Sequence, residues 1–231
     1  MKKKILLIII GLVCSALNLF AEEKTIVMLG DSTTLCDRNS ADKKITALVE
    51  NGLNQKFKQS KAKFKVINSG VGGSTAKEAV PRVQNSVIAH KPDIVTISFG
   101  LNDTGKSTPE EFKQSLESMI EAIKKDTKAQ IILITSTPFN SETHAWKDKF
   151  AKEGGVDLVL DTKFCSVMRT IATKHKIKIC DLHQKFEAEM KKDNALIKKV
   201  IMPDGVHLTD EGNVLASNFI LEEISKVLQG K

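Results

Sequence analysis

Short runs of β-branched and aliphatic residues recur along the chain, separated by longer segments with hydrophobic residues at helical spacing. Within the runs, isoleucine and valine follow one another rather than alternating with polar residues, which is typical of strands covered on both faces. Five strands are predicted, over 25–29, 64–68, 94–98, 131–135 and 177–180. Alternation of strands with helices predicts a three-layer α/β/α sandwich with a mostly parallel five-stranded sheet.

Three of the intervening segments carry helix signals. Thr108 precedes Pro109 and two glutamates, which combines a hydroxyl cap, a first-turn proline and acids that suit the helix dipole. Thr209, followed by two acids, gives a second start, and a third helix is predicted over 161–174. Residues 139–155 lack periodicity, so we expect either an irregular loop that faces the substrate and contains His144 and Trp146, or an ordinary surface segment. For Trp146 we favour packing on the core.

The first 21 residues have the pattern of a secretory signal peptide. Three lysines precede an apolar run over 5–13, and small and polar residues lead to Ala21. The pattern predicts cleavage after Ala21, a secreted or periplasmic protein, and one domain over 22–231. The alternatives are a retained membrane anchor, for which the 16 residues 5–20 are short, and a lipid-anchored form modified at Cys14.

Composition excludes several classes of partner. Cleavage lowers the formal charge from +7 to +4, because residues 1–21 contain three lysines and no acidic residue. The remaining positive charge is spread along the chain. With no nucleic-acid motif, we expect no nucleic-acid partner, and no stable membrane association after cleavage. Aromatic residues make up 5% and tyrosine is absent, which disfavours a broad aromatic platform for sugars.

The cysteines predict neither a disulfide framework nor a metal site. The mature chain keeps Cys36, Cys165 and Cys180, an odd number, and their spacing fits no metal-binding motif. Cys165 and Cys180 either pair in an oxidising compartment or, like Cys36, are buried as small apolar residues.

Four short segments carry the chemistry: Gly-Asp-Ser-Thr at 30–33, Asn-Ser-Gly-Val-Gly-Gly at 68–73, Gly-Leu-Asn-Asp at 100–103 and Asp-Gly-Val-His-Leu at 204–208. The first three follow predicted strands, and the fourth precedes the last helix. Because parallel strands end at one edge of their sheet, the four segments are expected to meet there.

Together these segments contain what acyl transfer through serine requires. Ser32 supplies a hydroxyl on a strand-to-helix turn, and His207 a base whose residue type titrates near neutral pH. Asp204, three residues before His207, can orient the imidazole. The backbone N–H groups of Ser32 and Gly73 and the side-chain amide of Asn102 can hold an oxyanion.

Each assignment has a structural alternative. Ser32 is also a suitable helix cap, and the glycines around Gly73 suit a flexible loop. Asn102 is also typical of a turn closed by its own side chain. His183, which we interpret as a helix-start residue, is the strongest alternative base.

The four segments in this order resemble the SGNH hydrolases, also called GDSL esterases and lipases, over about residues 25–228. The resemblance implies a flavodoxin-like fold and a nucleophile, two oxyanion donors and two further triad members at Ser32, Gly73, Asn102, Asp204 and His207. No cofactor or metal is implied.

The resemblance departs from the family name motif at Thr33, where the motif has leucine. Threonine also occurs there in the branch that resembles rhamnogalacturonan acetylesterases. We therefore expect a secreted serine esterase that removes O-acetyl groups from carbohydrate, with a small-molecule or polysaccharide ester as substrate. A lipid or thioester acylhydrolase of the same family is the alternative.

Residues 100–107, Gly-Leu-Asn-Asp-Thr-Gly-Lys-Ser, also match the phosphate-binding P-loop pattern. Pro109 follows at once and removes an N–H near the expected phosphate cradle, which disfavours a nucleotide-binding protein. A non-catalytic glycan-binding relative is the other distant alternative, and the intact set of five chemical positions disfavours it.

Overall fold

Five parallel strands form one sheet in the order β2-β1-β3-β4-β5. The computed structural model describes residues 23–60 and 62–230, so the predicted signal peptide 1–21 lies outside the described residues. The predicted strands are all present, with ends shifted by at most a few residues: β1 Glu23–Gly30, β2 Lys63–Gly70, β3 Ile94–Ser98, β4 Gln130–Ile134 and β5 Lys178–Cys180. The predicted fold class is confirmed, and the sheet is parallel throughout.

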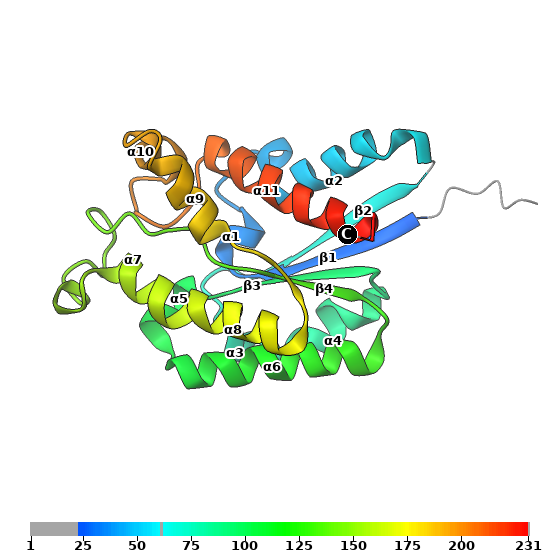
Figure 1. Ribbon diagram of the computed structural model, residues 1–231, viewed down its shortest axis with the longest axis horizontal. Helices are drawn as coiled ribbons and strands as arrows, with labels where there is room; N and C mark the ends of the chain where they lie inside the picture. The colour runs from blue at the N-terminus through cyan, green and yellow to red at the C-terminus, as the bar shows by residue number, and fades with distance from the viewer. Residues whose placement is uncertain (1–22, 61, 231) are drawn as a thin grey trace, which may run out of the picture.

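Helices cover both faces of the sheet (Figure 1). One layer contains α2 Ile45–Lys56, α9 Leu182–Met190, α10 Leu196–Val200 and α11 Asp210–Leu228. The other contains α3 Ala76–Ala79, α4 Val83–Ser86, α5 Leu101–Lys106, α6 Pro109–Asp126, α7 Val156–Val159 and α8 Ser166–His175. Short 3₁₀ turns occupy Ala41–Lys43, Lys58–Ser60, Val80–Arg82, Ile88–His90 and Ala151–Glu153.

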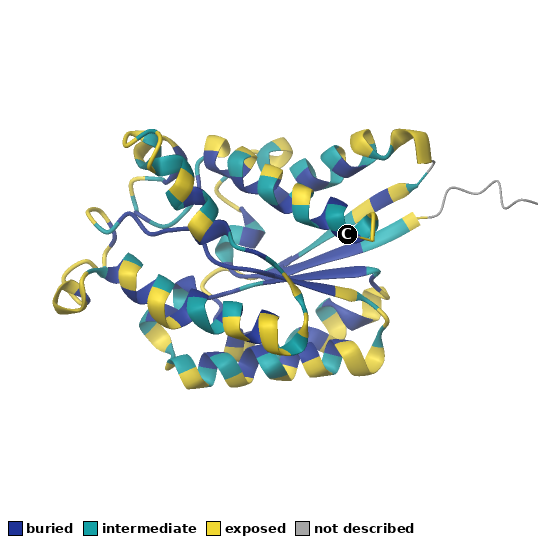
Figure 2. Cartoon of the chain, viewed as in Figure 1, coloured by how far each residue is buried: buried dark blue, intermediate teal, exposed yellow. Residues whose placement is uncertain are grey.

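The uninterrupted apolar strands follow from this double covering. In β1, Val27 and Leu29 join the core on the α6 side, whereas Ile26 and Met28 join the core on the α11 side. Successive side chains of a strand point to opposite faces, so a strand between two helical layers needs apolar residues at every position. Figure 2 shows the result as a buried sheet between helices exposed only on their outer faces.

The predicted helix starts at Thr108 and Thr209 are confirmed. Thr108 caps α6 in a reciprocal capping box with Glu111, and the Thr209 hydroxyl accepts from the Gly212 N–H at 3.1 Å. The helix predicted over 161–174 begins earlier, because α7, a π-helical segment Leu160–Cys165 and α8 follow one another directly. Burial of Val156, Val159 and Leu160 extends its apolar stripe toward the N-terminus.

The strand order places a topological switch at β1. The chain passes from β1 through α2 to β2 on one face, then through α3 and α4 to β3 on the other (Figure 1). Loops that leave the carboxyl ends of β1 and β3 therefore diverge to opposite faces, which opens the edge of the sheet to ligands.

Cys36, Cys165 and Cys180 are buried and form no disulfide in this structure, which fits the alternative in which they pack as small apolar residues. None of the helices in the described ranges combines the length and apolar character needed to cross a bilayer.

Candidate active site

The segment after β1 presents Ser32 at the first position of a short helix, α1 Ser32–Leu35. Its N-cap is Asp31, whose carboxylate accepts from the Thr33 N–H at 2.9 Å and the Thr33 hydroxyl at 2.8 Å. The interpretation of Ser32 as the cap is therefore wrong, because Asp31 already fills that role. The hydroxyl of Ser32 is left available to other partners.

Ser32, His207 and Asp204 form a continuous chain of polar contacts. His207 Nε2 lies 3.0 Å from Ser32 Oγ, and His207 Nδ1 lies 2.7 Å from Asp204 Oδ2. The first pair is separated by 175 residues in the sequence, so only the fold brings it together. In this geometry an imidazole can take a proton from a hydroxyl while the carboxylate fixes the ring.

The turn that carries Asp204 and His207 orders the carboxylate. Asp204 Oδ1 accepts from the N–H groups of Val206 at 3.0 Å and His207 at 3.1 Å. Burial alone would raise the pKa of Asp204, but the Val206 N–H and the His207 side chain and N–H outweigh it, and the pKa is lowered. Gly205 has φ +78°, and a Cβ there would lie 2.6 Å from the backbone nitrogen of His144, so the turn requires glycine.

Asn102 and the loop that contains Gly73 lie against each other. The side-chain amide of Asn102 donates to the Ser74 carbonyl at 3.2 Å, and Lys106 Nζ donates to the Gly73 carbonyl at 2.8 Å. Gly73 has φ +73° and open space around it. The same loop meets the start of α1, because the Val71 N–H donates to the Gly30 carbonyl at 3.1 Å. All five predicted site residues thus lie on segments in contact at one edge of the sheet.

Asp103, which sequence reasoning left without a role, joins two of these segments. Its carboxylate accepts from the Ala76 N–H at 3.0 Å and the Gly100 N–H at 3.2 Å, and so connects α5 to the start of α3. The side chain is fully buried, and this burial raises its pKa to about 7. The adjacent Asn102 and Asp103 therefore have different contacts: the amide of Asn102 bonds the loop that contains Gly73, and the carboxyl group of Asp103 holds the start of α3 that follows this loop.

We expect Asp103→Asn to flatten the dependence of stability on pH. Between its ordinary pKa near 3.8 and its folded value near 7, the folded protein holds a proton that the unfolded chain has released. Stability therefore falls as pH rises through this range, by up to about 4 kcal/mol in the wild type. Urea unfolding at about pH 5 and pH 8 measures the difference. An equal slope in both proteins would contradict the prediction, and Asp126→Asn, at an exposed carboxylate, is the control.

Residues 139–155 connect the two sides of the site. The Asn140 N–H donates to the Gly205 carbonyl at 2.8 Å, and Lys149 Nζ donates to the Gly105 carbonyl at 2.9 Å. Trp146 packs on the core, as expected, and closely against Gly105, where a Cβ would lie 2.4 Å from its ring. This loop thus contacts both the turn of His207 and the helix of Asn102.

His183, the alternative base, contacts other groups. As expected it lies at a helix start, in the first turn of α9, but its side chain is only 1% exposed. Its Nε2 lies 3.1 Å from Asp157, and its Nδ1 faces Asp161 at 3.5 Å. Burial alone would lower the pKa of His183, but Asp157 and Asp161 outweigh it and the pKa is raised. A ring held between two carboxylates is poorly suited to serve as a base.

The P-loop match at 100–107 does not form a phosphate-binding loop. Residues Leu101–Lys106 are helical from the first position. The N–H groups of Thr104 and Ser107 donate to the carbonyls of Gly100 and Asp103, so they are not free to bind a phosphate. Lys106 donates to Gly73. The nucleotide-binding alternative therefore lacks the open array of N–H groups that its motif predicts.

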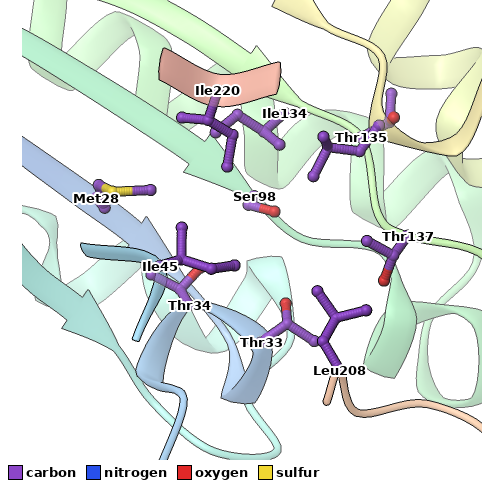
Figure 3. A pocket seen from close by; sticks show the side chains of 11 residues that line it. Met28, Thr33, Thr34, Ile45, Ser98, Ile134, Thr135, Thr137, Leu208 and Ile220 are labelled. Atoms are coloured by element: carbon purple, nitrogen blue, oxygen red, sulfur yellow. The ribbon is translucent and has the colours of Figure 1, made fainter. Parts of the chain in front are cut away.

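A small cavity lies behind α1, between the ends of β1, β3 and β4 and helix α11 (Figure 3). Thr33 and Leu208, the neighbours of Ser32 and His207, form part of its wall, and the Thr137 hydroxyl is buried without a hydrogen-bond partner. Its volume of about 20 Å³ is on the scale of one water molecule. The cavity is therefore too small to take an acyl chain.

A larger open groove of about 580 Å³ adjoins the site through Arg38. Apart from Met202, its other lining residues carry polar or charged side chains: Asn39, Lys199, Thr209, Asp210 and Glu211. Within the described residues, no group of three histidine, cysteine or acidic side chains is placed to hold a metal ion.

Comparisons with known proteins place the chain in a family. The chain is 30% identical to an uncharacterised lipoprotein, YqeF, of Bacillus subtilis, over 64% of this chain and 68% of that one. It is 25% identical to an acetylxylan esterase of Geobacillus stearothermophilus, over 70% and 72%. A crystal structure of a GDSL-like lipase described as putative, from Parabacteroides merdae, aligns with a TM-score of 0.71 and 21% identity over 89% and 97%. The model of the GDSL-like lipase/acylhydrolase family matches residues 28–215, and the chain belongs to this family.

Proposed function

We propose that this protein is a secreted serine esterase that removes O-acetyl groups from carbohydrate. The observation that carries the proposal is the chain of contacts from Ser32 Oγ to His207 at 3.0 Å and from His207 to Asp204 at 2.7 Å. Membership of an acylhydrolase family supports ester hydrolysis as the reaction.

In the proposed mechanism, Ser32 Oγ attacks the ester carbonyl while His207 Nε2 takes its proton. The negative charge that develops on the carbonyl oxygen is held by the N–H groups of Ser32 and Gly73 and the amide of Asn102. One N–H of Asn102 is already bonded to Ser74, which fixes the amide and leaves its second N–H for the oxyanion.

Collapse of the tetrahedral intermediate expels the alcohol, which receives the proton from His207, and leaves an acyl-Ser32 ester. Water then attacks this ester, His207 again acts as the base, and the carboxylic acid is released. Asp204 holds the ring in one tautomer and stabilises the imidazolium in both halves of the reaction.

The surroundings of the triad favour a hydroxyl-rich alcohol over a lipid. The groove next to Arg38 is lined mostly by side chains that donate and accept hydrogen bonds. The large hydrophobic side chains that are exposed within the described residues lie on separate segments: Val71 on the loop after β2, Leu158 in α7 and Val214 in α11. Similarity to an acetylxylan esterase supports acetyl as the acyl group and a sugar as the alcohol.

The pattern of residues 1–21 supports export, and so does similarity to a protein named as a lipoprotein. Expression of the full chain in a bacterium, followed by fractionation and N-terminal sequencing, tests this part. A mature N-terminus at Glu22 supports secretion, whereas recovery of the intact chain with the membrane would replace it with anchoring.

The substrate is tested by acid release from three kinds of ester: p-nitrophenyl acetate, p-nitrophenyl esters of longer acids, and an acetylated polysaccharide. Acetate release from the polysaccharide, lost in Ser32→Ala, is the expected result. Preference for long acyl chains would instead identify a lipid or thioester acylhydrolase. Absence of Ser32-dependent hydrolysis of every ester would refute the enzymatic assignment.

A further inference from the structure

We propose that Arg38 is a positioning residue of the catalytic machinery, which holds Asp204 in place and keeps His207 available as a base in weakly acidic solution. The inference rests on the proposed function, because it assigns Arg38 a part in the same site. Sequence reasoning gave Arg38 no role.

The contact that motivates the proposal is an ion pair between the Arg38 guanidinium and Asp204 Oδ2. The same oxygen bonds His207 Nδ1 at 2.7 Å, while Asp204 Oδ1 accepts two backbone N–H groups. Each carboxylate oxygen therefore has two donors, which is about the full capacity of the group. Arg38 supplies the one donor that comes from outside the turn containing Asp204 and His207.

Arg38 lies on a segment that links the two halves of the triad. α1 begins at Ser32 and ends in a left-handed turn at Cys36, after which the chain runs along the loop before α11. The side chain of Asn39 donates to the Leu208 carbonyl at 3.2 Å and to Asp210 at 2.8 Å. The 32–40 segment thus contains Ser32 at one end, and near its other end it is hydrogen-bonded to the loop that follows Asp204 and His207.

The charges around His207 give Arg38 a distinct electrostatic effect. His207 bonds Asp204 on its own turn, and Arg38, after α1, pairs with that same carboxylate. Asp31 at the start of α1 and His144 on the 139–155 loop interact with His207 through their charges. Burial lowers the pKa of His144, which keeps that ring neutral at neutral pH. Of these four groups, Arg38 alone brings a permanent positive charge, and its charge opposes protonation of the imidazole.

Loss of the Arg38 charge therefore has a predictable sign. Without the cation, the imidazolium form of His207 is less disfavoured, and the ring protonates at a higher pH. The acidic limb of kcat/KM should move in the same direction, because the protonated ring cannot accept the Ser32 proton. Arg38 is 52% exposed, so solvent screening limits the shift to about 0.5–1 pH unit.

The experiment compares three variants: Arg38→Gln, Arg38→Lys and Lys199→Gln. Lys199 lines the same groove but pairs with Asp193, so its loss removes an equal charge without touching Asp204. The pH midpoint of the His207 ring is followed by NMR in the Ser32→Ala background, which requires no activity. The kcat/KM profile on p-nitrophenyl acetate is recorded with Ser32 present.

We expect Arg38→Gln to raise both midpoints by about 0.5–1 pH unit and to lower kcat several-fold. Arg38→Lys should bring both pH midpoints most of the way back to the wild-type values, because it restores the charge. Lys199→Gln should leave both midpoints unchanged. An unchanged midpoint in Arg38→Gln, or an equal shift in Lys199→Gln, would overturn the proposal. Failure of the esterase assignment would show separately, as absence of Ser32-dependent hydrolysis, while the NMR titration still decides the role of Arg38.

Discussion

Ser32→Ala is expected to lower kcat for p-nitrophenyl acetate and for an acetylated polysaccharide by on the order of 10⁵–10⁶, the scale found when a serine nucleophile is removed. The reason is that the hydroxyl 3.0 Å from His207 Nε2 is the group that forms the acyl-enzyme in the proposed mechanism. With alanine at this position, the imidazole can at best activate water, and the covalent route is closed.

The control for this variant is Ser118→Ala, which removes an exposed hydroxyl on α6 that bonds only within its own helix. It should keep activity close to that of the wild type. Rapid mixing adds an independent readout: the wild type should show a burst of p-nitrophenol when deacylation is slow, and Ser32→Ala should show none. Turnover by Ser32→Ala at the wild-type rate would remove Ser32 from the mechanism.

Asn102→Ala is expected to lower kcat by about 10²–10³ with a much smaller change in KM, the usual result of losing one oxyanion donor. The Asn102 amide is held by the Ser74 carbonyl at 3.2 Å, next to Gly73, so its free N–H is oriented before substrate arrives. A donor fixed in advance stabilises the charge that develops in the transition state more than it stabilises the neutral ester.

Two further variants sharpen this test. Asn102→Asp keeps the size of the side chain but replaces the donor with an acceptor, and should be at least as damaging as alanine. Asn85→Ala, at an exposed asparagine of α4, should have no effect on kcat. A change in KM alone for Asn102→Ala would mean that the amide binds the ground-state ester and is not an oxyanion donor.

The three-layer fold could be predicted from local sequence because its strands are covered on both faces. Runs such as Ile26 to Leu29 must be apolar throughout when helices pack on both sides, and this pattern can be recognised in the sequence without tertiary information. The capped helix starts at Thr108 and Thr209 can also be predicted from the sequence, because capping depends on residues within one turn. The helix predicted over 161–174 was placed too late, since burial rather than capping extends it to Val156.

The residues of the candidate site were predictable because they occupy short motifs at the carboxyl ends of parallel strands. The sequence also offered alternatives that local pattern could not separate. Residues 100–107 satisfy the P-loop spacing letter for letter, yet they form a helix, since a motif fixes residue types but not backbone direction. Ser32 has the chemistry of a cap, but Asp31 takes that position.

The sequence by itself determined the sheet and its helical layers and predicted the five chemical positions, because each depends on periodicity or on residues close together in the chain. Only the tertiary structure decided which groups act on one another across long separations. Contact of Ser32 with His207, the ion pair of Arg38 with Asp204 and the enclosure of His183 by Asp157 and Asp161 join separate elements. Such pairings depend on how helices and loops pack, and no local pattern encodes a contact between residues that lie up to 175 positions apart.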